Sequence, residues 1–448
     1  MKINSLLVAA IVLAALSGFL YWSNHKKTSA SDVKVAADAP PKILTLSQAD
    51  INKLGIKKKG GEDVALAKND AGKWQITAPK ELRANQNEVS SMLSTLSSLT
   101  SERLIDAKAG NLAEYGLAQP AVEVDVAEKN NKSQRLLIGD STPTGNAFYV
   151  ALAGDPRVFT VDNYNKNNLD KSLNDLRDKR LLIFDQDKLS RVDLDTKKQE
   201  IEFGRNKDQW QIVKPQPLRA DDSNVQDLIR KLADAKMDLS VPEDVQKKAP
   251  AAFASGIAVA TAKVTDTSGT EVLQVRKNHG DYYAKSSEVA GVYKVGSDLG
   301  LALDKTVDDF RNKKLFDLGF TDPDKIEFHD GAKTYYLTKG GADWWSGDGK
   351  KVEMIDAEAF EEKVRDLSAS KFVDSGFTTP AMQLTVTAKS GKDVEKVLIS
   401  KNGDRYIAKR EDGPALYELD ASAVKDMEKA AADMKPAVEP KPAAKPKK

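Results

Sequence analysis

The stretch Lys73-Trp74-Gln75-Ile76 decides the fold, because the chain repeats it. It leads through Pro79 and Leu82-Arg83-Ala84 into a helical pattern. A second copy, around Gln209-Trp210-Gln211-Ile212, leads through the same residue types, and a third, weaker copy begins at Trp345. The three tryptophans lie 136 and 135 residues apart. A period this long predicts domain-sized modules, because solenoid repeats have periods of about 20–50 residues.

Each copy predicts the same order of elements. A strand near Ile51, Leu189 or Ile326 precedes a β-hairpin whose last strand carries the tryptophan. A helix follows, since apolar residues recur at spacings of three and four. In the first two copies these residues are Val89, Met92, Leu93, Leu96 and Leu99, and Val225, Leu228, Ile229 and Leu232. Short alternating strands come next, and they predict an antiparallel meander with one solvated face.

A second predicted helix closes each copy, and its register gives the strongest support for the repeat. Three apolar residues begin 10 residues after the last aromatic strand position and recur at +4 and +7. The three sets are Leu169, Leu173 and Leu176; Leu303, Val307 and Phe310; and Met427, Ala431 and Met434. After the helix, Leu176-Arg177-Asp178-Lys179 and Phe310-Arg311-Asn312-Lys313 lead directly into the next copy. We therefore expect modules that abut rigidly.

The amino-terminal residues predict a membrane anchor. The apolar run from Leu6 to Trp22 contains no charge, and its 17 residues are near the lower limit of about 17–25 for a spanning helix. Tyr21-Trp22 suits the aromatic belt at a membrane interface. The alternative is a cleaved signal peptide with a small-residue site at Ala15-Leu16-Ser17. The apolar run continues past that site, so we favour an uncleaved anchor.

The segments at the two ends of the modules have the composition of flexible chain. Residues 28–42 are rich in Ser, Ala, Asp and Pro and predict a linker. Lys-Pro-Ala repeats after Met434 predict a disordered tail. The orientation in the membrane stays open on charge alone, because Lys2 on one side of the apolar run faces His25-Lys26-Lys27 on the other.

Composition argues against several classes of function. The net charge is +1, from 68 basic and 67 acidic residues, so no overall field attracts nucleic acid. The absence of cysteine excludes disulfides, cysteine nucleophiles and thiolate metal sites. The three histidines stand without a neighbouring histidine, which argues against a catalytic triad or a zinc site. We predict no catalytic, cofactor or metal-binding residues, and hence a protein that is not an enzyme.

A few residues are candidates for contacts with a partner. Arg177 and Arg311 are placed to bind an anion between modules, although ion pairing at a helix end is the plainer interpretation. Trp344 and Trp345 are adjacent in a strand, so they face opposite sides of it. The repeat assigns Trp345 to the core, which makes Trp344 the candidate for an exposed contact. Asp221-Asp222 precedes an apolar helix pattern and predicts a cap, not an acid/base pair.

Several of these features together are similar to one protein family. They are the amino-terminal apolar segment, Trp-x-Ile with a following proline, Tyr115-Gly116-Leu117 with Pro120, Leu137-Ile138-Gly139 with Tyr149 in the next strand, and Leu176-Arg177-Asp178-Lys179. The chain resembles the bacterial domain-of-unknown-function family numbered 4340. The resemblance implies a membrane-anchored envelope protein associated with ABC-type export or gliding-motility transport systems, and it implies no catalytic residues.

We predict an α+β protein with three tandem antiparallel β-meander modules, two helices in each, and one amino-terminal transmembrane helix. The predicted parts are an anchor at 1–27, a linker at 28–42, modules at 43–183, 184–318 and 319–434, and a disordered Lys/Pro/Ala tail at 435–448. The resemblance places the protein in the bacterial inner membrane as a single-pass protein, with the modules in the periplasm or outside the cell.

The favoured function is the binding of a protein partner, a transporter or another envelope component, through the repeated modules. The alternative is a glycan- or peptidoglycan-binding envelope protein that uses exposed aromatic residues such as Trp344. An enzyme using carboxylate chemistry would need two acidic residues that face one cleft.

Overall fold

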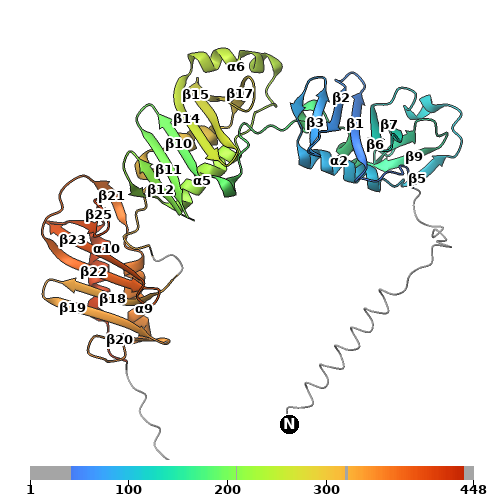
Figure 1. Ribbon diagram of the computed structural model, residues 1–448. Coiled ribbons are helices and arrows are strands. Elements are labelled where there is room, and N and C mark those ends of the chain that lie inside the picture. The colour runs from blue at the N-terminus through green and yellow to red at the C-terminus, as the bar shows by residue number, and fades with distance from the viewer. Residues whose placement is uncertain (1–41, 208, 318–320, 438–448) are drawn as a thin grey trace, which may run out of the picture. The chain divides into compact units, whose positions relative to one another are not determined.

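The computed structural model describes residues 42–207, 209–317 and 321–437 (Figure 1). In these ranges the chain is α+β, with three antiparallel sheets. The main helices pack on one face of each sheet, and in the second module the helix Glu243–Ser255 packs on the opposite face, against Tyr283. The chain divides into two compact units, the first ending at Asp178 and the second beginning at Lys179. No helix in the described ranges combines the length and apolar character needed to cross a membrane. The predicted anchor, nearly all of the linker and the end of the tail lie outside the described residues.

The first module forms the sheet β4-β3-β2-β1-β6-β7-β8-β9-β5. The strands are β1 (Ile51–Lys58), β2 (Val64–Lys68), β3 (Trp74–Ala78), β4 (Leu82–Arg83), β5 (Arg103–Asp106), β6 (Val122–Glu128), β7 (Ser133–Ser141), β8 (Ala147–Leu152) and β9 (Val158–Asp162). The helices are α2 (Gln86–Ser98), the 3-10 turn η1 (Leu112–Tyr115), α3 (Asn163–Leu169) and α4 (Leu173–Leu176).

The second module forms the sheet β13-β12-β11-β10-β14-β15-β16-β17. The strands are β10 (Arg191–Thr196), β11 (Glu200–Asn206), β12 (Gln209–Lys214), β13 (Leu218–Arg219), β14 (Ile257–Asp266), β15 (Gly269–Asn278), β16 (Asp281–Ser286) and β17 (Val292–Val295). The helices are the 3-10 turn η2 (Gln186–Lys188), α5 (Asp222–Ala233), α6 (Glu243–Ser255), α7 (Ser297–Leu303) and α8 (Val307–Phe310).

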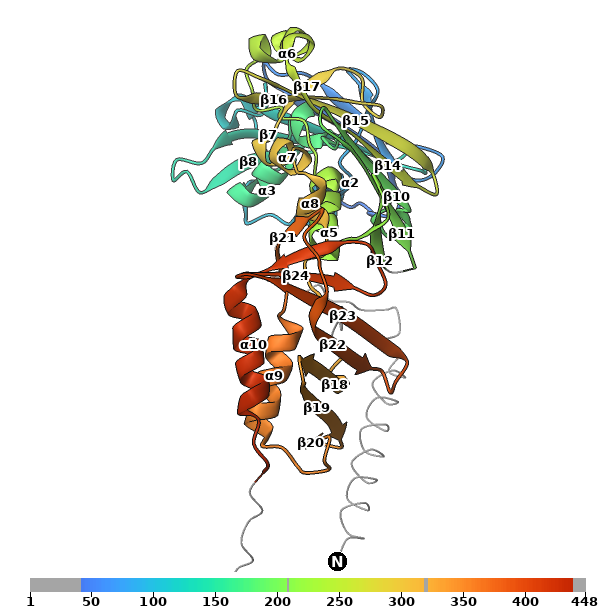
Figure 2. The ribbon, with the colours of Figure 1, turned by 90° about the vertical axis from the view of Figure 1, so that its left-hand side faces the viewer.

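The third module forms the sheet β20-β19-β18-β22-β23-β24-β25-β21. The strands are β18 (Pro323–Asp330), β19 (Lys333–Gly340), β20 (Asp343–Ser346), β21 (Ala369–Val373), β22 (Pro380–Ala388), β23 (Asp393–Asn402), β24 (Arg405–Arg410) and β25 (Leu416–Leu419). The helices α9 (Met354–Arg365) and α10 (Ala421–Asp433) lie side by side against one face of this sheet (Figure 2).

Each sheet contains two meanders where the sequence predicted one. The first strand of each module lies between them: β1 pairs with β2 and β6, β10 with β11 and β14, and β18 with β19 and β22. The first helix of the module connects the two halves. The central position suits the first strand because its apolar residues on the helix-facing side, such as Leu54 and Ile56, are fully buried.

The predicted helix register is confirmed. Leu169, Leu303 and Met427 occupy matching positions and none has measurable exposure. The closing helix, however, is continuous only in the third module. In the first module, Ser172 starts a new helix with a capping box: the Asp175 N–H donates to Ser172 Oγ (3.3 Å) and the Ser172 N–H donates to Asp175 Oδ2 (2.8 Å). Capping residues favour a helix start over a helix interior. In the third module Ala430 stands at this position, and the helix runs through it.

Helix α6 was not predicted, and it changes one sheet edge. In the first and third modules the strands β5 and β21 pair with β9 and β25 at that edge. In the second module α6 lies against β17, and Gln246 Nε2 donates to the carbonyl oxygen of Val292 (2.9 Å). The helix therefore covers part of an edge that would otherwise present unpaired backbone groups.

The three modules hold their first residues in the same way. A backbone N–H near the start of each module donates to a side chain at one equivalent position, on β7, β15 or β23. The three pairs are Thr45 with Gln134 (3.2 Å), Ile183 with Glu271 (2.6 Å) and Asp317 with Glu395 (3.0 Å). This repeated contact supports the division of the chain into three copies of one module.

These contacts move the module boundaries toward the amino terminus relative to the predicted ones. Leu181 and Leu182 were assigned to the first module, but they are buried in the core of the second. Leu315 and Phe316 were assigned to the second, but they are buried in the core of the third. The third module also extends past residue 434, because Pro436 forms a β-bridge with Val352. The closing helices of the first and second modules are thus followed at once by residues that pack into the next core.

Candidate functional site

The second and third modules enclose a pocket of about 320 Å³, which we call the seam pocket. The second module contributes β12, β13 and the end of α8, and the third contributes β21 and the turn between β24 and β25. The lining residues of the second module are Gln211, Ile212, Pro217, Leu218, Arg219, Arg311 and Asn312. Those of the third are Phe372, Arg410, Asp412, Gly413, Pro414, Ala415 and Tyr417.

The backbone fixes both walls of the pocket. On one side Arg311 forms a β-bridge with Ala220, and the Asn312 N–H donates to the carbonyl oxygen of Arg219 (2.9 Å). On the other side the Ala369 N–H donates to the carbonyl oxygen of Lys313 (2.8 Å). Consecutive residues are therefore bonded to different modules. No flexible linker separates the two walls, as the sequence predicted for this junction.

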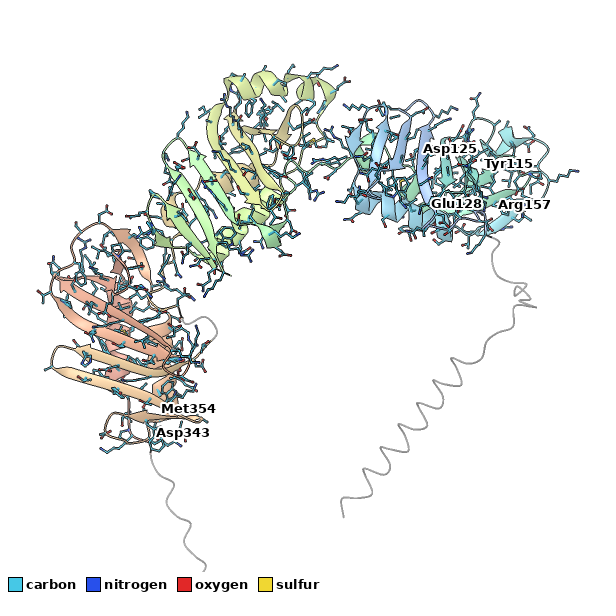
Figure 3. The ribbon with its side chains drawn as sticks, in the orientation of Figure 1. Tyr115, Asp125, Glu128, Arg157, Asp343 and Met354 are labelled. Atoms are coloured by element: carbon cyan, nitrogen blue, oxygen red, sulfur yellow. The ribbon has the colours of Figure 1, made fainter. Side chains whose placement is uncertain are left out.

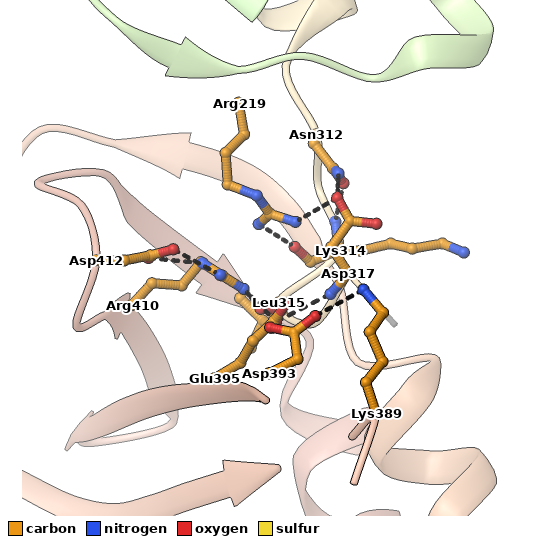
Figure 4. Close-up of polar contacts among 10 residues, drawn as sticks. All are labelled: Arg219, Asn312, Lys314, Leu315, Asp317, Lys389, Asp393, Glu395, Arg410 and Asp412. Atoms are coloured by element: carbon orange, nitrogen blue, oxygen red, sulfur yellow. Dashed lines mark hydrogen bonds and ion pairs between the residues drawn. The ribbon is translucent and has the colours of Figure 1, made fainter. Parts of the chain in front are cut away.

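Arg219 reaches from the second module to the first residues of the third (Figure 4). Its guanidinium donates to the carbonyl oxygen of Lys314 (2.8 Å) and to Asp317 Oδ2 at the longer distance of 3.4 Å. The side chain is 24% exposed. Arg219 thus lines the pocket and also bonds across the seam.

Arg410 forms the deepest charged group of the pocket (Figure 4). Its side chain is 6% exposed and donates to the carbonyl oxygen of Leu315, to Glu395 (2.8 Å) and to Asp412 (2.8 Å). Burial acts to lower the pKa of Arg410, but the hydrogen bonds with Asp412 and Glu395 outweigh it and raise the pKa above its usual value. Arg410 therefore stays charged and anchors the start of the third module.

Arg311 packs over an aromatic ring. The centre of its guanidinium is 3.4 Å from the centroid of Phe372, within the range of a cation–π contact. It also donates to Asp308 (3.0 Å), and its side chain is only 13% exposed. Because Arg311 belongs to the second module and Phe372 to the third, this stack is a second contact across the seam.

The charges of the lining residues are unevenly balanced. Arg219, Arg311 and Arg410 border the pocket, and Asp412 is the acidic residue among the described lining residues. The partner carboxylates Asp308, Asp317 and Glu395 are outside the lining. The remaining lining residues are mostly apolar, such as Leu218, Phe372, Pro414 and Tyr417, and Gln211 and Asn312 are polar. Each guanidinium already has a carboxylate partner within the chain. A carboxylate that enters the pocket on an apolar or aromatic group would share one of these guanidinium groups, which pair well with carboxylates.

The structure separates the two candidate arginines. Arg311 lines the seam pocket, whereas Arg177 belongs to the first compact unit, where its backbone forms a β-bridge with Ala84 and its side chain is buried. The plainer interpretation of Arg311 as an ion-pairing residue at a helix end is confirmed, but its partner is Asp308 and not the expected Asp309, whose carboxylate bonds to Thr306.

The prediction that Trp344 is exposed is wrong. Trp344 is 3% exposed and packs in the core of the third module, while Trp345 is 39% exposed. The repeat was read one residue out of register: Trp344 corresponds to Trp74, since a lysine ammonium, Lys339 or Lys68, lies 5.3–5.4 Å from each ring. The proposed stacking of a sugar on Trp344 is therefore sterically excluded in this structure.

The acidic clusters act as structural groups. The Asn224 N–H donates to Asp221 at the start of α5, and the Trp210 N–H donates to Asp222, so the predicted cap is confirmed. One further group of carboxylates, Asp193, Glu200 and Glu202, gathers within 4.8 Å. Two basic side chains, Arg191 and Lys214, pair with this group at 2.6–3.1 Å. Each of the three carboxylates thus already has a basic partner within the chain.

Sequence reasoning did not single out Phe372, Arg410 or Asp412. In the sequence these three residues come late in the third module, far from Arg219 and Arg311. Only the fold brings the two groups together. The available signal was indirect: Phe310-Arg311-Asn312-Lys313 joins the two modules without a linker, which predicts contact between them.

Comparison with known proteins identifies the family of the chain. The model of the family described as "Domain of unknown function (DUF4340)" matches residues 74–211 and 210–381, which together are more than half of the chain. Each match begins at the tryptophan-bearing strand of one module and reaches at least as far as the tryptophan-bearing strand of the next module. Each match therefore spans a junction between modules. No curated protein and no solved structure matches the chain. The chain therefore belongs to the DUF4340 family.

Proposed function

We propose that this protein is a membrane-anchored envelope protein that binds a protein partner, and that the seam pocket receives an acidic segment of that partner. The proposed partner is a transporter, of the ABC type that the family resemblance implies, or another envelope protein. The role is that of a binding component, with no chemical step. The anchor is residues 6–22, and the modules stand in the periplasm or outside the cell.

The composition of the seam pocket is the observation that carries this proposal. Residues that contribute most to protein interfaces are enriched in arginine and aromatic residues and gather in pockets at the centre of the contact. The seam pocket combines three arginines with Phe372 and Tyr417. Its volume of about 320 Å³ suits one or two side chains of a partner segment. The backbone contacts on both walls preorganise the pocket, which reduces the entropy lost on binding.

The test is cross-linking from inside the pocket in intact membranes. A photoreactive amino acid replaces Ala415, which lines the pocket, and cross-linked products are identified by mass spectrometry. We expect one dominant envelope or transporter product. The same substitution at Ala153, on the first module, gives the background. If the two positions yield the same products, the seam pocket is not the binding site.

A pair of matched variants then tests the role of charge. Arg311 and Arg230 each pair with an aspartate three residues earlier, Asp308 and Asp227, but only Arg311 lines the pocket. We expect Arg311→Gln to abolish recovery of the partner and Arg230→Gln to leave it unchanged. Circular dichroism confirms that both variants are folded. Equal recovery with both variants would refute recognition of an acidic group by Arg311.

A further inference from the structure

The residues after the closing helix of the third module make the same backbone contacts to their own module as the corresponding residues of the second module do. At the end of the second module, the Asp221 N–H donates to Phe310 O (2.7 Å), and Ala220 forms a bridge with Arg311. At the end of the third, the Glu353 N–H donates to Lys435 O (2.9 Å), the Ala437 N–H donates to Lys351 O (2.7 Å), and Val352 forms a bridge with Pro436. Residue 437 thus leaves the third module at the position where a further module would begin.

We call the surface around this position the end face, defined by Trp345, Lys351, Met354, Ile355 and Pro436. Met354 and Asp343 mark this end of the module in Figure 3. Ile355 is 76% exposed, Met354 49% and Trp345 39%. The equivalent residues of the second module, in the same order, are the polar Ser223, Asp222 and Gln211, and of these Gln211 lines the seam pocket. Large apolar side chains therefore stand exposed on the third module where the second has polar ones, which marks an interaction surface.

The junction between the second and third modules, which we call the internal seam, shows which kind of surface contacts the end of a module. There the end of the second module contacts Phe372 on β21 and the turn that contains Pro414. The first module has a surface built from the same elements, which we call the head face: Leu104 and Ile105 on β5 and the turn Asp155–Arg157. Leu104 on β5 pairs with Phe159 on β9, as Phe372 on β21 pairs with Tyr417 on β25. Leu104 and Phe372 therefore occupy equivalent positions.

The head face also exposes apolar side chains. Leu104 is 47% exposed and Ile105 38%. Pro156, in the turn beside them, occupies the position of Pro414. The head face thus exposes the same kinds of residue that, in the third module, contact the end of the second module.

We infer that the end face of one copy of this protein docks on the head face of a second copy, with Trp345 in the place that Gln211 holds at the internal seam and with Met354 and Ile355 extending the contact beyond it. The two surfaces are different, so the contact is heterologous and leads to head-to-tail chains instead of closed dimers. The inference concerns a surface separate from the seam pocket and stands independently of the partner proposed for that pocket.

The absence of cysteine makes a direct test straightforward in the full-length protein. Two differently tagged chains are co-expressed in membranes, one carrying Ile355→Cys and the other Leu104→Cys, and are treated with a short bismaleimide cross-linker. We expect a cross-linked dimer that carries both tags. Both residues are strongly exposed, so the substitutions leave the fold intact. Leu301→Cys, on the 63%-exposed Leu301, replaces Ile355→Cys in the control, and we expect loss of the mixed dimer.

Two outcomes would overturn the inference. A mixed dimer no stronger than with the Leu301→Cys control would show that the faces do not meet. Dimers formed only between two Ile355→Cys chains would show end-to-end association. A second variant supports the specific contact: Met354→Glu in the Ile355→Cys chain places a charge in the apolar contact, and we expect loss of the mixed dimer while membrane levels of the protein are unchanged.

Discussion

Arg410 is a single side chain that holds the start of the third module in place. Its three partners are Leu315 O, Glu395 and Asp412, and both Arg410 and Glu395 are almost fully buried. Removing one partner of a buried ion pair leaves an uncompensated charge and costs about 3–5 kcal/mol. We therefore expect Arg410→Ala to lower the free energy of unfolding of the third module by about 3 kcal/mol, measured by urea denaturation followed by tryptophan fluorescence.

Two further variants make this prediction specific. Arg230 pairs with Asp227 on an exposed helix surface, and loss of such a pair costs about 0–1 kcal/mol. Arg410→Lys keeps the charge but loses the fork geometry that serves several acceptors at once, so its effect lies between the other two. A loss of stability in Arg410→Ala no larger than in Arg230→Ala would show that the buried pair does not stabilise the module.

Asp412 gives the same cluster a dependence on pH. Its hydrogen bond with Arg410 lowers the pKa of the Asp412 carboxyl below the ordinary value of 3.8. The folded state thus favours the charged form, and the stabilisation is complete above the pKa of the unfolded chain and is lost as the pH falls through the folded pKa. We expect Asp412→Asn to be less stable than wild type at neutral pH, and the difference to shrink below about pH 4. Urea midpoints over this range measure it, and a difference independent of pH would contradict the assignment.

The two tryptophans of the third module show what a residue pattern leaves open. Adjacent residues in a strand face opposite sides, so either Trp344 or Trp345 had to be buried. A shift of one residue exchanges the two faces completely. The spacing of the tryptophans favoured the wrong one, since the lengths of the turns differ between copies. The pairing of Lys339 with Trp344, which matches that of Lys68 with Trp74, resolves the register only once the hairpin is known.

At the scale of elements, Ser172 tests why the closing helix of the first module is broken. Its hydroxyl and the Asp175 carboxylate satisfy two backbone N–H groups at the start of α4. Replacing a serine cap by alanine costs about 1 kcal/mol. We expect Ser172→Ala to lower the free energy of unfolding of the first module by about this amount and to speed amide exchange in α4. Ser172→Thr retains the hydroxyl and serves as the control. Equal stability of the alanine and threonine variants would mean that the cap contributes nothing.

The elements that could be predicted are those with a strong local pattern. The tryptophan hairpins and the amphipathic stripes of α2 and α5 were visible in apolar spacing, and their positions are confirmed. The strands β5 and β21 were missed because each is short and gains its pairing from a strand far along the chain. Helix α6 was missed for another reason: it contains Pro250 and buries only two residues, so it lacks an extended apolar stripe.

At the scale of the whole molecule, the threefold repeat was predictable and the seam pocket was not. The repeat follows from the spacing of similar residues along one chain. The pocket combines residues about 200 positions apart, such as Gln211 and Asp412, and depends on how two modules meet. The absence of a linker after Phe310 predicts that they meet, but no local pattern predicts which strand turn of the third module faces the second.

The last prediction concerns the apolar run from Leu6 to Trp22 and its effect on the whole protein. An uncleaved anchor keeps the protein in membranes that are washed with alkaline carbonate, and its intact mass includes the amino-terminal residues. An arginine at the centre of a spanning helix costs about 2.5–3.5 kcal/mol of insertion free energy, so we expect the double variant Leu13→Arg, Ala14→Arg to leave the washed membranes. A wild-type mass that begins after Ser17, with the protein in the soluble fraction, would instead establish a cleaved signal peptide. In that case the head-to-tail contact would form between chains that no membrane anchor holds. Cross-linking in the soluble fraction would then test whether the contact forms.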